Sequence, residues 1–289
     1  MNTHSSRIVC LSAETTETLC LLGEEHRIVG FSGPIARLPA TQHRKPRVSI
    51  YTGARIDRIC ALEPDLVLGC GETHGDVLAA LAQRGVAVHL FNQRSVRGIL
   101  DMIRVVGGLV GRGDAAAALA ASLEWRLEAI RVRSVDERRP CIYLEEWDEP
   151  AISASGWVSE LIDIAGGTNC FADLAARSRQ EDRIIYDLDE VVERAPDIII
   201  ASWIGKTFQA GRIEARSGWR RIPAVINGEL HEVHSSQLQF GPAALTEGIS
   251  ELHRIVERWR ERRTRVFQTA FVPYTTHAPR GEMASERVA

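Results

Sequence analysis

Aromatic side chains stand at the carboxyl ends of strand-like segments in both halves of this 289-residue chain. In open α/β sheets, ligands bind at these strand ends. Aromatic rings there stack on a large, flat or partly apolar ligand, while a few polar groups orient it. The four aromatic residues, with the amide side chain near the last of them, are Tyr51, Trp147, Trp203, Phe240 and Gln237. The alternative is that Trp147 and Trp203 only anchor loops on their own half of the molecule.

Acidic residues accompany the aromatic ones. Glu14 follows the first strand-like segment, and Glu145 and Glu146 directly precede Trp147. Their carboxylates suit hydrogen bonds from ligand amides, or alternatively cap the helices behind them. Because neighbouring side chains on an extended chain point to opposite sides, at most one of Glu145 and Glu146 faces a ligand. We therefore take Glu14 and Glu146 as ligand-binding candidates.

Other kinds of site are disfavoured by the spacing of their residues. His231 and His234 lie three residues apart on a predicted strand, hence on opposite faces, whereas zinc needs three or four convergent ligands. Residues 69–75 match GxGxxxG rather than the dinucleotide fingerprint GxGxxG, which favours a tight turn at a cleft edge. No GxSxG nucleophile elbow occurs in the sequence. We therefore predict no metal site, no cofactor and no catalytic residues.

Predicted strands and helices alternate along the chain, which is typical of α/β layering with a parallel sheet. Short apolar runs are predicted as strands, and helical segments lie between them. The predicted strands cover residues 7–11, 28–31, 48–51, 65–68, 86–91, 141–144, 198–200 and 230–233. The last predicted helix covers residues 243–263.

One long helix is predicted in the middle of the chain, at residues 114–135. This segment is rich in Ala, Leu, Glu and Arg, the strongest helix formers, and Pro140 prevents its continuation. Asp114 is its predicted N-cap. At 1.5 Å per residue it is roughly 30 Å long, about the width of a small domain. The apolar residues that share one of its faces are Leu119, Leu123, Leu127 and Ile130.

The segments on the two sides of this helix repeat one another. Residues 56–68 align without gaps on residues 188–200, and both predict a helix stopped by proline and followed by a buried strand. The repeat favours two similar lobes with a ligand cleft between them. The predicted organisation is an N-terminal lobe, a connecting helix, a C-terminal lobe and a loosely ordered tail, at residues 7–111, 112–138, 139–263 and 264–289.

In their order and spacing, four segments resemble the substrate-binding proteins of ABC transporters that are built on a long backbone helix. Within that family the similarity is greatest to the cobalamin-binding and iron-siderophore-binding members. The segments are residues 7–17 (RIVCLSAETTE), 58–68, 158–167 and 222–228. The resemblance extends over about residues 7 to 260. It implies two α/β lobes joined by a rigid helix, a ligand held between them, small lobe movements and no catalysis.

The resemblance also implies roles for particular residues. Tyr51 occupies a position that carries a ligand-stacking aromatic residue in the cobalamin binders. An acidic residue at the outer tip of each lobe docks onto arginines of the transporter, and Glu72 or Asp76, and Glu214, lie in matching regions. Ala13 departs from the family pattern, which often has proline there.

Composition restricts the partners and the location. The net charge is −3 with no long run of one sign, which disfavours nucleic acid and membrane surfaces as partners. No apolar run reaches 18 residues, so no membrane span is predicted. The residues before Arg7 contain no apolar core of a signal peptide, which predicts a cytoplasmic location for the sequence as written, and a periplasmic one if the native start lies upstream. The six cysteines form no CxxC pair and suit a reducing compartment.

We therefore expect a non-catalytic solute-binding protein that holds a cobalamin-like corrinoid, or another tetrapyrrole-sized compound, with an ABC transporter permease as a candidate partner. One alternative is a ferric-siderophore or haem binder, for which Arg37, Arg44 and Arg47 would supply a cationic cleft. The other is a cytosolic enzyme or cofactor-assembly factor on the same scaffold.

Overall fold

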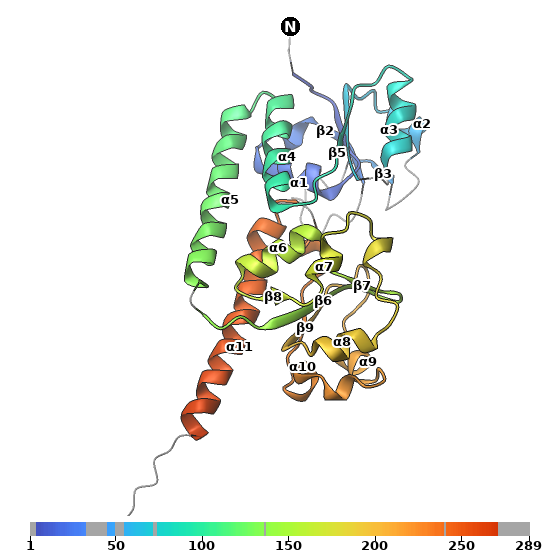
Figure 1. The fold of residues 1–289 in the computed structure, drawn as a ribbon. Coiled ribbons are helices and arrows are strands. Elements are labelled where there is room, and N and C mark those ends of the chain that lie inside the picture. The colour runs from blue at the N-terminus through green and yellow to red at the C-terminus, as the bar shows by residue number, and fades with distance from the viewer. Residues whose placement is uncertain are drawn as a thin grey trace, which may run out of the picture.

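Two mostly parallel β-sheets form the centres of two lobes (Figure 1). The computed structural model describes residues 4–32, 45–49, 55–71, 74–135, 137–239 and 241–270. Helices cover both sheets, and one long helix, α5 (Gly113–Arg133), runs alongside the two lobes. The predicted fold class, two α/β lobes with mostly parallel sheets joined by a long helix, is confirmed.

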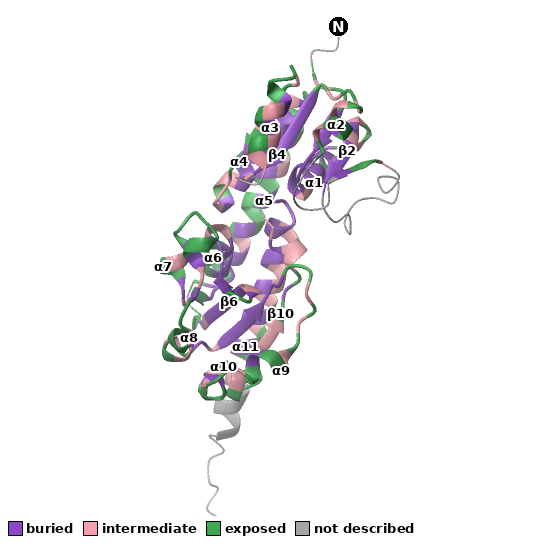
Figure 2. Cartoon of the chain, turned by 90° about the vertical axis from the view of Figure 1, so that its right-hand side faces the viewer, coloured by how far each residue is buried: buried purple, intermediate pink, exposed green. Residues whose placement is uncertain are grey.

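The first sheet has five parallel strands in the order β3-β2-β1-β4-β5. One face packs against α1 and α4 and the other against α2 and α3, so β1 and β4 are buried on both sides (Figure 2). The strands are β1 (Ile8–Cys10), β2 (Ile28–Ser32), β3 (Arg47–Ser49), β4 (Leu66–Cys70) and β5 (Val88–Phe91). The helices are α1 (Ala13–Leu21), α2 (Ile56–Cys60), α3 (Gly75–Ala82) and α4 (Val96–Leu109).

The second sheet has the order β10-β9-β6-β7, with β8 also paired to β6. All its pairs are parallel except β6 with β7. Its strands are β6 (Cys141–Asp148), β7 (Ala151–Ser153), β8 (Thr168–Asn169), β9 (Ile198–Ala201) and β10 (Leu230–Glu232). The helices are α6 (Gly156–Ile164), α7 (Ala172–Ala175), α8 (Asp189–Arg194), α9 (Ala210–Glu214), α10 (Pro223–Ile226) and α11 (Ile249–Ala270), the last preceded by a π-helical turn at Ala244–Gly248.

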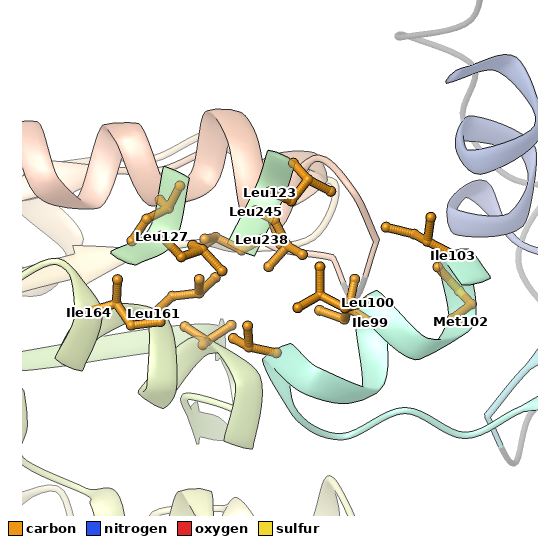
Figure 3. Close-up of a cluster of buried hydrophobic side chains, with 14 of the residues drawn as sticks. Ile99, Leu100, Met102, Ile103, Leu123, Leu127, Leu161, Ile164, Leu238 and Leu245 are labelled. Atoms are coloured by element: carbon orange, nitrogen blue, oxygen red, sulfur yellow. The ribbon is translucent and has the colours of Figure 1, made fainter. Parts of the chain in front are cut away.

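Helix α5 joins the cores of the two lobes into one apolar cluster. Figure 3 shows Leu123 and Leu127 of α5 on one side of a cluster that also contains Leu100 of α4 and Leu161 of α6, which belong to different lobes. Helices α4 and α5 approach closely, because a Cβ atom added to Gly107 would lie 2.2 Å from that of Ala116. Since close-packed interiors resist deformation, this shared core opposes large rotations of one lobe against the other.

The sequence repeat is also a structural repeat. In each lobe a short helix is followed by a non-glycine residue with positive φ, Glu63 at 46° and Ala195 at 44°, directly before the proline. The next residue, Asp65 or Asp197, accepts a hydrogen bond from the backbone N–H that begins the neighbouring strand, at 3.1 Å from Arg7 and 3.0 Å from Cys141. The two βα units are therefore equivalent in geometry as well as in sequence.

Several element boundaries differ from the prediction. Helix α5 begins at Gly113 with Arg112 as its N-cap, so Asp114 lies in the first turn instead of capping it. Its most buried face is Ala116, Ala120, Leu123, Leu127 and Ile130, while Leu119 is only partly buried. Strand β6 continues to Asp148, because β7 pairs with it as a hairpin. The predicted end of the last helix at Arg263 is too early, since α11 reaches Ala270, and residues 271–289 of the predicted tail lie outside the described part of the chain.

Candidate ligand-binding site

A cavity of about 800 Å³ lies between the two lobes, at the carboxyl ends of their strands. From the N-terminal lobe it is lined by the last residues of β2 and β4 and by residues that follow β1, β4 and β5. From the C-terminal lobe it is lined by the end of β6, the start of α6, the segment after α7 and the residues that follow β9. We call this cavity the interlobe pocket. A pocket of this size, with mixed apolar and polar walls, is within the range of small-molecule and cofactor sites.

The turn from β1 into α1 forms one wall of the interlobe pocket. Ser12 caps α1 by accepting a hydrogen bond from Thr15 N–H (3.5 Å), and its hydroxyl donates to the Cys70 thiol (3.1 Å). This cap orients the first turn so that Ala13 and Glu14 reach the wall. Glu14 is only 6% exposed, and burial raises the pKa of its carboxyl above the usual glutamate value. A carboxyl with a raised pKa is able to donate a hydrogen bond as well as accept one.

The turn after β4 forms the adjacent part of this wall. Gly71 has a φ of +66°, a conformation that favours glycine, and it lines the pocket as the predicted tight turn at the cleft edge. His74 follows, with Nδ1 at 2.8 Å from the carbonyl oxygen of Cys70. Burial lowers the pKa of the His74 imidazole. The side chain is therefore a neutral, pocket-lining imidazole at neutral pH.

A partly buried ion pair shapes the opposite wall. Arg183 Nη1 lies 2.8 Å from Glu146 Oε2, and the same guanidinium donates to Ser153 O. The other carboxylate oxygen of Glu146 accepts from Ser155 N–H at 2.7 Å. The pair thus holds the segment between β7 and α6 against the end of β6.

Helix α6 begins at this segment and presents its first turn to the interlobe pocket. Trp157 lines the cavity, and its indole Nε1–H donates to Leu238 O at 2.8 Å, which fixes the ring. The segment after α7 runs nearby and contributes Arg177 and Arg179 to the lining. The C-terminal wall therefore combines a held aromatic ring with cationic side chains, an arrangement suited to a large ligand that carries polar groups.

Polar contacts connect the two lobes around the pocket. Glu160 of α6 accepts a hydrogen bond from Val96 N–H (2.9 Å) at the start of α4, and Glu17 of α1 accepts one from Ala243 N–H (3.3 Å). The guanidinium of Arg94 donates to Ser178 O. Gly156 lies so close to Arg94 O that an added Cβ would be 2.8 Å from it. These contacts and the shared core fix the width of the cavity.

The structure brings together two of the seven predicted site residues. Glu14 and Glu146 line the interlobe pocket from opposite lobes. As alternation along a strand predicts, Glu146 lies at the pocket and Glu145 on the other side of β6, fully buried. Tyr51 and Phe240 lie outside the described residues.

The other three predicted residues lie outside the pocket lining. Trp203 is 5% exposed and packs in the C-terminal lobe, where its Nε1–H donates to Glu145 Oε1 at 2.9 Å. Trp147 bonds Glu149 O (2.7 Å) and stacks under Lys206, and Gln237 lies 3.5 Å from Glu247. The tryptophans therefore fit the alternative in which they anchor their own lobe, because each indole N–H is used internally.

Sequence reasoning missed Trp157, Ser155, Arg177 and Arg183 as pocket-lining residues. The signal for the first two was present: a serine and a glycine before an amphipathic helix mark a helix start, and helix starts face ligands in α/β folds. The two arginines had no such signal, because tertiary contacts bring them to the pocket: α7, which precedes Arg177, packs against α6, and the turn that contains Arg183 packs against β7.

Two features of the described residues bear on other kinds of site. No helix within them is both long and apolar enough to cross a membrane. Nor do they gather three His, Cys, Asp or Glu side chains at a place that could hold a metal ion.

The family described as periplasmic binding protein matches residues 8–236. The chain belongs to this family. Its members are substrate-binding proteins, and the shared region contains both sheets and all the residues that line the interlobe pocket except Leu238 and Gln239.

Individual relatives are similar to most of the chain. A cobalamin-binding protein of Halobacterium salinarum is 26% identical over 78% of this chain, which spans only 60% of that longer relative. A vitamin B12-binding protein of Vibrio campbellii is 24% identical, with coverage of 91% of this chain and 93% of the relative.

Solved structures share the fold. The periplasmic vitamin B12-binding protein of Vibrio cholerae superposes with a TM-score of 0.71 at 20% identity, covering 88% of this chain and 98% of that one. A periplasmic haem-binding protein of Roseiflexus has a TM-score of 0.73 at 22% identity, covering 87% and 99%. At these identities the solved structures establish the architecture alone.

Proposed function

We propose that this chain is a non-catalytic solute-binding protein and that it holds a cobalamin-like corrinoid in the interlobe pocket. The observation that carries the proposal is the cavity of about 800 Å³ between two lobes at the carboxyl ends of their strands. The names of the sequence relatives from Halobacterium and Vibrio support a corrinoid as the ligand. Trp157 offers a ring for the macrocycle, and Glu14 and Glu146 offer hydrogen-bonding groups for its amide side chains.

Calorimetric titration with cyanocobalamin tests this function. We expect stoichiometric binding, and a ligand at 100 times its Kd should add about 2.7 kcal/mol to the free energy of unfolding. Trp157→Ala should weaken binding about tenfold, because it removes a held ring from the pocket wall. The matched control is Trp125→Ala, since Trp125 is 75% exposed on α5 and does not line the pocket. No heat and no change in melting temperature with cyanocobalamin would exclude the corrinoid.

Haem is a second candidate ligand, favoured by one pocket residue. When Nδ1 of His74 donates its proton to Cys70 O, Nε2 keeps its lone pair and is able to ligate haem iron. A titration with hemin followed by its absorption spectrum tests this candidate. The histidine-ligated spectrum should disappear in His74→Ala if His74 is the axial ligand.

We further propose that the chain delivers its ligand to an ABC transporter permease on the outer side of a membrane. Each lobe offers an exposed acidic residue for such a contact, Asp76 at the start of α3 and Glu214 at the end of α9. Glu72 lies outside the described residues. Charge reversal at Asp76 and Glu214 together should reduce ligand uptake by cells while cyanocobalamin binding in solution stays unchanged.

A further inference from the structure

The start of α6 has a buried hydroxyl that is left without a partner. Ser155 is the N-cap of this nine-residue helix and lines the interlobe pocket, yet its side chain makes no capping hydrogen bond. Ser155 is 2% exposed, and its Oγ has no hydrogen-bond partner among the residues that the structure describes. A buried polar group without a hydrogen-bond partner costs free energy. A ligand atom that forms a hydrogen bond with this hydroxyl would remove that cost.

The charge around this hydroxyl favours an anion. The first-turn backbone N–H groups of an α-helix lack partners inside the helix and carry partial positive charge, which attracts carboxylate and phosphate groups. Gly156 and Trp157 of this first turn line the pocket. Arg177 lines the same pocket, and its guanidinium donates only to the backbone oxygen of Asp182, at 3.4 Å, with no ion pair among the described residues.

Two of the three acidic residues of the pocket, Glu146 and Glu14, have their charge offset. Glu146 is paired with Arg183, and Glu160 accepts the backbone N–H of Val96 at the start of α4. Burial raises the pKa of Glu14, which favours its neutral form. Against the remaining charge of Glu160, the lining also contains Arg94, Arg177 and Arg179, so its net charge is positive.

We propose that the start of α6, the Ser155 hydroxyl and the Arg177 guanidinium form a subsite for an oxyanion, a carboxylate or phosphate group carried by the ligand. The inference rests on the proposed function, because the oxyanion is part of the solute held in the interlobe pocket. Ser155 donates to one oxygen and Arg177 to another, while the backbone N–H groups of the first turn face the same charge.

Three corrinoids with the same macrocycle distinguish the sources of the oxyanion. Cyanocobalamin carries a phosphodiester, dicyanocobinamide lacks it, and cobyrinic acid has carboxylates where the other two have amides. Arg177→Gln should raise the Kd for the probe that carries the recognised oxyanion about tenfold, equivalent to 1.4 kcal/mol. It should change the Kd of dicyanocobinamide less than twofold. A loss confined to cyanocobalamin identifies the phosphate, and one confined to cobyrinic acid identifies the carboxylate.

Two further variants separate this role from a structural one. Ser155→Ala should weaken binding of the same probe severalfold. It should not lower the melting temperature of the ligand-free protein, because Ser155 Oγ caps nothing and the substitution removes a buried polar atom that has no partner among the described residues. Arg220→Gln is the matched control for lost charge, since Arg220 is exposed and lies outside the pocket lining. The loss in Arg177→Gln should shrink as salt is raised, whereas Arg220→Gln should match the parent throughout.

Two outcomes would overturn the subsite. One is an equal loss of affinity for all three corrinoids in Arg177→Gln, which would show a general effect on the pocket. The other is unchanged affinity of both Arg177→Gln and Ser155→Ala for cyanocobalamin and cobyrinic acid. Failure of the parent protein to bind any of the three corrinoids would instead refute the proposed function.

Discussion

At the carboxyl ends of their strands, the C-terminal lobe contains buried charges where the N-terminal lobe contains small hydroxyl groups. In the C-terminal lobe, Glu145 is fully buried and accepts hydrogen bonds from Tyr143, Trp203 and Arg216 at 2.7–2.9 Å. In the N-terminal lobe the corresponding region is held by Ser12, whose backbone oxygen accepts from the hydroxyls of Thr15 and Thr16.

At the opposite, amino-terminal ends of the strands the two lobes are alike. Asp65 and Asp197 make the same contact to the neighbouring strand, and the residues two positions before them share the same positive φ. Ligands of α/β sheets bind at the carboxyl ends. The repeat is thus retained where the strands only need to be aligned, and the lobes differ where they face the interlobe pocket.

The largest expected effect comes from removing the buried Glu145 carboxylate of the C-terminal lobe. Glu145→Ala should lower the free energy of unfolding by about 3–5 kcal/mol, because it leaves the largely buried Arg216 guanidinium and two other donors without their acceptor. Urea unfolding measures the loss. In the parent protein, burial lowers the pKa of Arg216, but the hydrogen bonds and the charge of Glu145 more than offset it and raise the pKa overall, so Arg216 faces Glu145 as a cation.

The control for this prediction is Glu149→Ala. Glu149 is an acidic residue four positions away with an 80% exposed side chain, whose removal should change the free energy of unfolding by less than about 0.5 kcal/mol. A loss below about 1 kcal/mol in Glu145→Ala would show that the buried network stabilises the lobe no more than the hydroxyl groups of its counterpart do.

A second experiment uses the pH dependence of stability to distinguish a buried acidic residue of each lobe, Glu14 and Asp148. Burial raises the pKa of Glu14 above 4.5, so its stabilising contribution is complete below pH 4.5 and is lost as pH rises through the folded-state pKa. For Asp148, burial raises the pKa, but Lys206 and Arg212 together outweigh it and lower the pKa below 3.8. The contribution of Asp148 to stability is therefore present above pH 3.8 and is lost as pH falls through its folded-state pKa.

The matching variants should therefore diverge in the ligand-free protein. Glu14→Gln should equal the parent near pH 4 and become the more stable protein toward pH 8, gaining at most about 1.4 kcal/mol per pH unit within the titration window. Asp148→Asn should be less stable than the parent at neutral pH. Chemical unfolding at a series of pH values measures both. If the free energy of unfolding of Glu14→Gln and of the parent changed with pH in the same way, Glu14 would not have the raised pKa that distinguishes it from Asp148.

The fold was predictable because its signals are local. The repeat of residues 56–68 and 188–200 contains a proline stop and an apolar run, and each feature acts within a few residues. The same holds for α5, whose buried Leu123, Leu127 and Ile130 follow helical spacing. The antiparallel strand β7 was missed because it is three residues long and is defined by its pairing with β6.

The site was less predictable because its residues depend on tertiary contacts. Trp203 follows a strand as a ligand-stacking residue would, yet its ring is buried, because Glu145 and Arg216 complete a polar network around it. The position of Glu14 and Glu146 at the pocket was predictable, because the turn after β1 and the alternation along β6 are enough to place them. Arg177 reaches the pocket only through the position of α7 against α6, which no local pattern encodes.

The smallest expected effect concerns Asp65 and Asp197, the equivalent aspartates of the repeated segments in the two lobes. Asp65→Ala and Asp197→Ala each remove hydrogen bonds to a backbone N–H at a strand start, and both residues are at least partly solvent-exposed. Each variant should lose about 1 kcal/mol of unfolding free energy, and the two losses should agree within about 0.5 kcal/mol. Glu193→Gln, an exposed residue of α8, is the control and should match the parent. If only one of the two variants lost unfolding free energy, the aspartate of the repeat would stabilise the strand pairing in that lobe alone, although the geometry is the same in both.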